Sequence, residues 1–272
     1  APAGPRAARS PFMTLRGGLG ELVESLASRL DRADVEMSLG RELSRIRELP
    51  GPTAEGPGRY RLELGGDELV ADAVVLAISA PAASRLLREL RPRSADLLDT
   101  IPHASSATVS LAYPAGSVPP SSRGYGFVVP TVERGDLLAA TFTSWKWAGR
   151  APDSISLVRG YVGGVGHEAL LAKDDEAIAS RVQAELWRLA GVTGKPSVTR
   201  VHRFRGGMPQ YTLGHLERVA AARADLPPGL FLAGASYGGV GIPDCIGAGY
   251  AAAGEVLAGL DEASPANARL GG

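Results

Sequence analysis

The feature that most restricts the fold of this chain lies near its C-terminal end, where residues 230–259 read LFLAGASYGGVGIPDCIGAGYAAAGEVLAG. The apolar segment Leu230–Ala233 leads into a glycine-rich turn and then into a run of small residues. This pattern predicts a strand, a tight turn and a helix whose backbone can lie close to a ligand. The amides at such a helix start suit an anionic group. Tight packing of helix on sheet, with Asp244 as N-cap, explains the same spacing, which also departs from GxGxxG.

Other segments predict an α/β fold with α+β elements. Apolar residues at positions 19, 22, 23, 26 and 30 predict an amphipathic helix. Strands are predicted over residues 35–39, 42–48, 60–64 and 74–78, with a helix after Pro81. Between residues 104 and 164, four strand-like segments predict an antiparallel sheet, with Trp145 and Trp147 on one side of a strand. A helix bounded by an acidic start at Asp174 or Asp175 and a stop at Gly191 follows.

Composition excludes several functional classes. The 29 basic and 29 acidic side chains balance, which argues against an electrostatic nucleic-acid binder. The single cysteine excludes an internal disulfide framework, and the four scattered histidines form no metal-ligand pattern. There is no secretory signal and no apolar run of the roughly 18 to 20 residues that a membrane helix needs. The expected compartment is the cytoplasm, with peripheral membrane contact left open.

Several motifs together carry a family resemblance. The segment LAGASYGGVGIPDCIGAGYAAA resembles the C-terminal flavin motif of the protoporphyrinogen/coproporphyrinogen oxidase family of FAD flavoproteins. Further motifs agree in order and spacing over residues 12–260: FMTLRGGLGELVESL, ADAVVLAISAPAASRLL, GYGFVVP, TFTSWKW, RGYVGG and MPQYTLGHLERV. The resemblance implies FAD as cofactor. It covers the C-terminal part of such an enzyme, because no GxGxxG unit precedes residue 12.

The resemblance also implies a domain layout. Residues 1–81 are expected to form part of an FAD-binding domain, which is interrupted by a substrate-binding domain over residues 82–203. Residues 204–272 are expected to return to the FAD-binding domain and to supply a helix that contacts the flavin. Within this layout the antiparallel sheet would hold the substrate.

Site residues follow from the same resemblance. The positions matching the flavin border are Ala235, Val240, Gly241 and Ile242, and Leu43 matches a position whose backbone contacts the adenosine part. The positions matching the substrate pocket are Tyr125, Val128 and Tyr161, for which sheet core is the alternative interpretation. No catalytic side chain and no metal ligand is implied, since the flavin itself carries out the redox chemistry.

The implied function is FAD-dependent oxidation of coproporphyrinogen III, or of protoporphyrinogen IX, to the porphyrin in haem biosynthesis, with oxygen as acceptor. Coproporphyrinogen III is favoured because Tyr125, Arg159 and Tyr161 form a more polar set than an aliphatic slot. Two alternatives stay open. One is another flavoenzyme of the amine-oxidase superfamily, acting on an amine or a polyene; the other is a truncated, inactive or partner-dependent fragment. The oligomeric state is not predicted.

Overall fold

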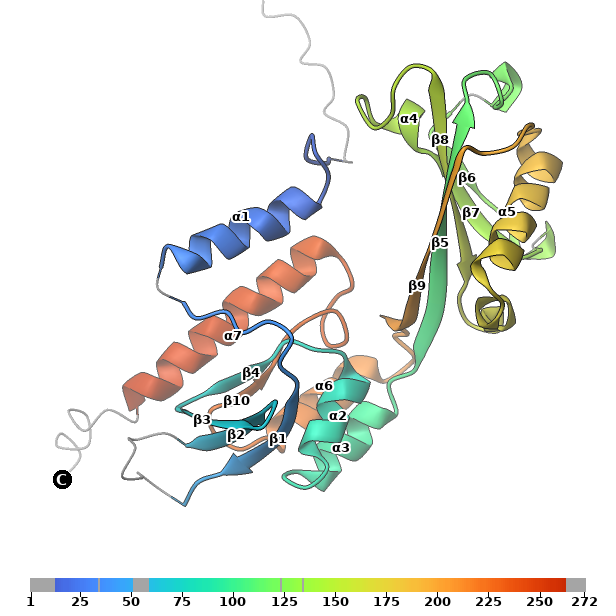
Figure 1. Ribbon diagram of the computed structural model, residues 1–272. Helices are drawn as coiled ribbons and strands as arrows, with labels where there is room; N and C mark the ends of the chain where they lie inside the picture. The colour runs from blue at the N-terminus through green and yellow to red at the C-terminus, as the bar shows by residue number, and fades with distance from the viewer. Residues whose placement is uncertain (1–12, 34, 51–58, 123, 134, 263–272) are drawn as a thin grey trace, which may run out of the picture.

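The computed structural model describes residues 13–33, 35–50, 59–122, 124–133 and 135–262, and Figure 1 shows two bodies joined by long strands. The first body combines two small sheets with helices. Its antiparallel sheet has the order β1 (Leu43–Glu48), β2 (Tyr60–Leu64), β3 (Asp67–Ala71). Its parallel sheet pairs β4 (Val74–Leu76) with β10 (Leu230–Leu232). Its helices are α1 (Gly20–Asp31), α2 (Ala80–Leu87), α3 (Pro92–Asp99), α6 (His215–Ala224) and α7 (Ile242–Glu262).

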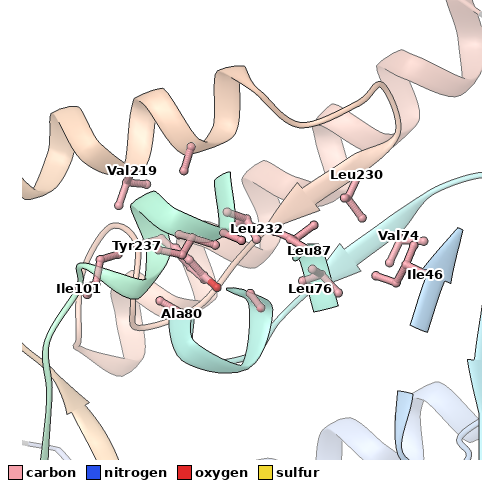
Figure 2. Close-up of a cluster of buried hydrophobic side chains, with 14 of the residues drawn as sticks. Ile46, Val74, Leu76, Ala80, Leu87, Ile101, Val219, Leu230, Leu232 and Tyr237 are labelled. Atoms are coloured by element: carbon pink, nitrogen blue, oxygen red, sulfur yellow. The ribbon is translucent and has the colours of Figure 1, made fainter. Parts of the chain in front are cut away.

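The core of this first body brings distant parts of the chain together. Leu76 of β4 and Leu232 of β10 are each 3% exposed, as expected for parallel strands covered by helices. Figure 2 shows them among side chains from α2 and α6 and from the segment after α3. Tyr237, in the turn after β10, is also fully buried in this cluster. The glycine-rich turn is therefore built onto the core and does not hang free.

The second body is a five-stranded antiparallel sheet with one helix on it. The strand order is β6 (Gly126–Val128), β7 (Leu137–Phe142), β8 (Ile155–Gly163), β5 (His103–Pro114), β9 (Val198–Pro209). The helix α5 (Asp175–Ala190) covers one face of this sheet (Figure 1). It approaches so closely that a Cβ at Gly160 would lie 2.5 Å from Val182 Cγ1. The remaining elements are the short helix α4 (Thr143–Lys146) and the 3-10 turns Pro120–Ser122, Thr131–Glu133 and Glu168–Ala172.

The predicted ends of α5 are confirmed. The side chain of Asp174 accepts a hydrogen bond from the Ala177 amide at 2.8 Å, which caps the helix start. Gly191 ends the helix with a φ of 62°, in the left-handed region that glycine adopts without strain. The helix over residues 20–31 and the strands near 43–48, 60–64 and 74–76 are confirmed as well.

Two local predictions were wrong. Residues 35–39 form no strand, since they have neither a strand partner nor burial: Val35 is 46% and Leu39 is 89% exposed. Trp145 lies in α4 and Trp147 directly after it, so the two rings do not share a strand face. β7 ends at Phe142 and α4 begins at Thr143, and Trp145 packs against Phe142 with ring centroids 5.2 Å apart.

The two bodies meet where β5 starts and β9 ends. His103 pairs with Pro209 at this root, and the two strands run together into the second body. We expected domain boundaries at residues 81 and 203. Buried side chains of α2 and α3, and Ile101 after them, belong to the first core, so we propose boundaries near residues 102 and 209 instead. Among the described residues, no helix is both long and apolar enough to cross a membrane.

Candidate functional site

The turn between β10 and α7, residues 234–241, is here called the glycine loop. It leaves β10 through Gly234, whose φ of +113° is a conformation that side-chain-bearing residues rarely adopt. At its other end the Asp244 carboxylate accepts a hydrogen bond from the Gly241 amide at 3.1 Å. The interpretation of Asp244 as N-cap is therefore wrong. Asp244 is the third residue of α7, and its carboxylate reaches back to the helix start, as the acid of a capping box does.

The outer side of the loop and of α7 is open. In the part of the chain that the structure describes, no heavy atom other than those of chain neighbours and of the α7 backbone itself lies within 4 Å of the position that a Cβ would take at Gly238, Gly247 or Gly249. The side chains of Val240 and Ile242 are 63% and 47% exposed. A flat ring could thus approach the backbone here without meeting side chains, which is the property that the glycine pattern predicted.

The residues expected to contact the flavin differ in whether their backbone groups are already hydrogen-bonded. The Gly241 amide is engaged by Asp244, whereas the amides of Val240 and Ile242 have no hydrogen-bond partner within the described ranges. Ala235 is half-buried, and its carbonyl oxygen accepts a hydrogen bond from the Tyr211 hydroxyl at 2.7 Å. Two free amides beside a helix start, on an accessible backbone, fit the polar edge of a flavin ring.

Four side chains fix the inner side of the glycine loop to the rest of the first body. Besides the bond from Tyr211, the Tyr237 hydroxyl donates to the carbonyl of Ile78 at 3.0 Å, and burial raises the pKa of this tyrosine. His103 Nε2 lies 3.0 Å from Ser236 Oγ, which also accepts a hydrogen bond from the Ala80 amide at 3.1 Å. Since Ser236 is 3% exposed, water does not compete strongly for these bonds.

The geometry selects one tautomer of the neutral His103 ring. Its Nδ1 lies 2.9 Å from the carbonyl oxygen of Ile101, which can only accept, so Nδ1 carries the proton. Nε2 is then the acceptor, and the Ser236 hydroxyl donates to it. Every polar atom of this chain of bonds has a matching partner. The root of β5 is in this way connected directly to the glycine loop.

A second histidine near the glycine loop differs from His103 in its hydrogen bonding. His215, the first residue of α6, is 4% exposed, and neither of its ring nitrogens has a hydrogen-bond partner of normal geometry in the described part of the chain. The ring instead stacks on Tyr211, with centroids 3.8 Å apart. Burial, aided by the charge of Arg218, lowers the pKa of His215, which a backbone interaction with Tyr237 partly offsets.

Leu43 lies apart from the glycine loop in sequence, at the start of β1. Its side chain packs against the first core, and its backbone pairs with Leu64. Among the described residues β1 is an edge strand, so one row of its backbone amides and carbonyls has no strand partner there. A main-chain contact of the expected kind is therefore compatible with the position of Leu43.

The expected substrate residues fall on the second body. Val128 of β6 pairs with Ala139 of β7, which pairs with Tyr161 of β8. Directly opposite residues of antiparallel strands point to the same side, so Val128 and Tyr161 share one face. This face is opposite to α5, whose side chains pack against the alternate residues. We call it the open face. Tyr125 precedes β6 and is 70% exposed.

Comparisons with known proteins identify the family. The family model described as flavin containing amine oxidoreductase matches residues 6–257, most of the chain. The chain belongs to this family of flavoproteins. Its glycine loop and its antiparallel sheet are thus parts of the amine oxidoreductase fold, and a flavin is the group that fits the open loop backbone.

Individual members of the amine oxidoreductase family are similar to this chain over most of its length. It is 37% identical over 264 residues to coproporphyrinogen III oxidase of Propionibacterium freudenreichii, covering 95% of this chain and 47% of that protein. It is 32% identical over 252 residues to protoporphyrinogen oxidase of Homo sapiens, covering 90% of this chain and 51% of that protein. A crystal structure from Exiguobacterium sp. 255-15 matches with a TM-score of 0.76 at 30% identity, covering 91% of this chain and 52% of that one. The chain spans about half the length of the curated relatives it matches.

Sequence reasoning missed the residues that hold the glycine loop from within this amine oxidoreductase fold. The sequence assigned no role in the site to His103, Ser236 or Tyr211. The two partners in the bond between His103 and Ser236 are 133 positions apart, so no local pattern could have joined them. The signal in the sequence was only indirect: Ser236 and Tyr211 both lie inside motifs that carried the family resemblance.

Proposed function

We propose that this chain is the flavin-facing and substrate-facing part of an FAD-dependent porphyrinogen oxidase that acts in the cytoplasm. The observation that carries the proposal is the open, glycine-lined backbone at the start of α7, together with relatives named coproporphyrinogen III oxidase and protoporphyrinogen oxidase. The reaction converts a porphyrinogen to a porphyrin, with oxygen as the electron acceptor.

FAD, when bound, supplies the chemistry by accepting hydride from the substrate. The residues of this chain would position the flavin and the substrate and shield them from water. The amides of Val240 and Ile242 would face the polar edge of the ring, while the partial positive charge at the start of α7 favours negative charge there. The bonds from His103 and Tyr211 keep the glycine loop in place beneath it. Leu43 would contribute a backbone contact to the adenosine part.

The antiparallel sheet would hold the macrocycle on its open face. Val128, Ala139 and Tyr161 form a cross-strand row of mainly apolar character, suited to the faces of pyrrole rings. A porphyrinogen has weak C–H bonds at its carbon bridges, so its oxidation depends on orientation and exclusion of water more than on an acid or base. Each two-electron oxidation would also release a proton from the substrate, which solvent can accept, so no side chain of the described residues is assigned as a base in this scheme.

The test is an assay of the protein as its gene encodes it, purified with its flavin. Coproporphyrinogen III and protoporphyrinogen IX are supplied separately under air, and porphyrin formation is followed by fluorescence. We expect a higher kcat/KM for coproporphyrinogen III. A higher value for protoporphyrinogen IX would reverse the choice of substrate. Absence of porphyrin from both, with an amine or a polyene oxidised instead, would overturn the proposed function.

A further inference from the structure

A second row of residues crosses the open face beside the row of Tyr161. Thr141 of β7 pairs with Arg159 of β8, and Arg159 pairs with Ser110 of β5. Ser110 in turn pairs with Arg200 of β9. Arg159 stands two residues from Tyr161 on the same strand, so both side chains point to the open face, roughly 7 Å apart along β8.

Arg159 is held in a way that leaves part of its guanidinium free. Its Nε donates to Ser110 Oγ at 3.2 Å. In the described part of the chain, its two terminal nitrogens have no hydrogen-bond partner, and Arg159 forms no ion pair. A guanidinium whose Nε is tied down has lost part of its rotational freedom, and its two terminal N–H groups form a fork that matches a carboxylate.

Arginines on the other side of the sheet behave differently. Arg203 pairs with Asp175 at the start of α5, and Arg181 of α5 pairs with Asp136. On the open face, by contrast, Arg159 beside Ser110 has no carboxylate partner among the described residues. Arg200, which pairs with Ser110 from the edge strand β9, has none there either, although its Nη1 donates to the carbonyl of its neighbour Thr199 at 3.1 Å. The strands β8 and β9 lie on either side of β5, which places the two arginine backbones roughly 10 Å apart. Positive charge is thus concentrated in this row, whereas the neighbouring row of Tyr161 continues through Thr108 to His202.

We propose that Arg159, positioned by Ser110, binds a carboxylate of the substrate, with Arg200 as a second cation beside it. The site would thereby select macrocycles that carry a propionate at the edge lying over this row. The inference rests on the proposed function and adds a specificity-determining residue to it. It also gives a reason for preferring coproporphyrinogen III, which has four propionates where protoporphyrinogen IX has two.

The test compares substitutions at Arg159 in the protein as its gene encodes it. Arg159→Met removes the charge at similar length, Arg159→Lys keeps the charge but loses the fork, and Ser110→Ala removes the tether. Arg85→Met is the matched control, since Arg85 is an exposed arginine on α2 in the first body, without an ion pair in the described residues. Two readouts are used: KM and kcat for both porphyrinogens, and binding of coproporphyrin III and of its tetramethyl ester by fluorescence titration.

We expect Arg159→Met to raise KM for coproporphyrinogen III about tenfold, the order of one charged hydrogen-bond pair, with kcat changed by less than about twofold because the flavin side is untouched. The effect on protoporphyrinogen IX should be smaller. Arg159→Lys should recover part of the loss, and Ser110→Ala should lose about two- to threefold. Binding of coproporphyrin III should weaken in parallel, whereas binding of the uncharged tetramethyl ester should not change.

Equal KM values for Arg159→Met and Arg85→Met would overturn the inference. So would an equal loss of binding for coproporphyrin III and its ester, since that points to damaged packing and not to a lost carboxylate partner. If Arg159→Met does not fold, the pair Arg159→Lys and Ser110→Ala decides by the same criteria. A wild-type protein that forms no porphyrin at all refutes the proposed function, which is a different result from one that forms porphyrin with Arg159 unimportant.

Discussion

Replacing Gly239 by alanine should destabilise the start of α7. A Cβ at this position would lie 2.5 Å from Asp244 Cβ and 2.6 Å from Asp244 Cγ. The Gly239 backbone is outside the left-handed region, so the penalty comes from this contact and not from φ. Asp244 would have to move and give up its bond to the Gly241 amide. Loss of such a capping interaction costs about 1 kcal/mol, and the forced shift adds roughly another 1 kcal/mol.

The neighbouring glycine provides the control. Apart from its chain neighbours, Gly238 has no heavy atom of the described residues within 4 Å of its Cβ position, and it has no positive φ, so Gly238→Ala should be nearly neutral. Thermal unfolding followed by circular dichroism should show Tm lower by about 4 to 8 °C for Gly239→Ala only, taking roughly 2 to 4 °C per kcal/mol. Amide exchange at the start of α7 should accelerate in the same variant. Equal Tm values for the two variants would refute the steric reasoning.

Four further outcomes follow from described contacts. His103→Gln can still place an acceptor near Ser236, whereas the shorter Asn cannot, so amide exchange in the glycine loop should quicken more in His103→Asn. Because the folded-state pKa of His215 lies below its ordinary value, the unfolded chain binds the proton more readily, and the free energy of unfolding should fall as pH drops below about 6.5; urea titrations at several pH values should show this fall reduced in His215→Phe. Gly126→Ala should lower Tm, because its Cβ would lie 2.2 Å from the Ala140 carbonyl oxygen at a φ of +148°; unchanged Tm would contradict this. Equilibrium dialysis should find FAD bound only weakly by the 272-residue chain, with a Kd above micromolar. The reason is that these residues lack the GxGxxG unit, which supplies several of the charge-assisted bonds to the pyrophosphate.

Local signals in the sequence predicted most elements but not their partners. The acidic start and the terminal glycine bounded α5. The apolar run over residues 74–78 predicted a strand buried on both faces; the strand β4 is present, but Val75 is 39% exposed, so the predicted burial is correct for one face only. Residues 35–39 show the limit of such reasoning, since alternation indicates a strand only where another strand is available to pair with it. Trp147 shows a second limit, because β7 ends at Phe142 and the chain turns helical at Thr143, which strand propensity alone does not indicate.

In the candidate site, the glycine loop was predictable because the glycines that form it are close together in the sequence. The bonds that hold it were not, since His103, Ser236 and Tyr211 come together only once β5 and β9 share a root. Arg159 illustrates an intermediate case. Strand alternation placed it on the same side as Tyr161, but the position of α5 was needed to show which side of the sheet stays uncovered.

The pairing of His103 with Pro209 has a consequence for how such a protein can change over time. Directly paired residues lie about 5 Å apart, so the chain leaves the first body and returns to it at nearly one point. A segment with adjacent ends and its own core can be lengthened, reshaped or exchanged for a homologous segment while the join stays the same. New substrate preferences could then be grafted between residues 102 and 209 without redesigning the flavin side, as long as the histidine at the junction is kept.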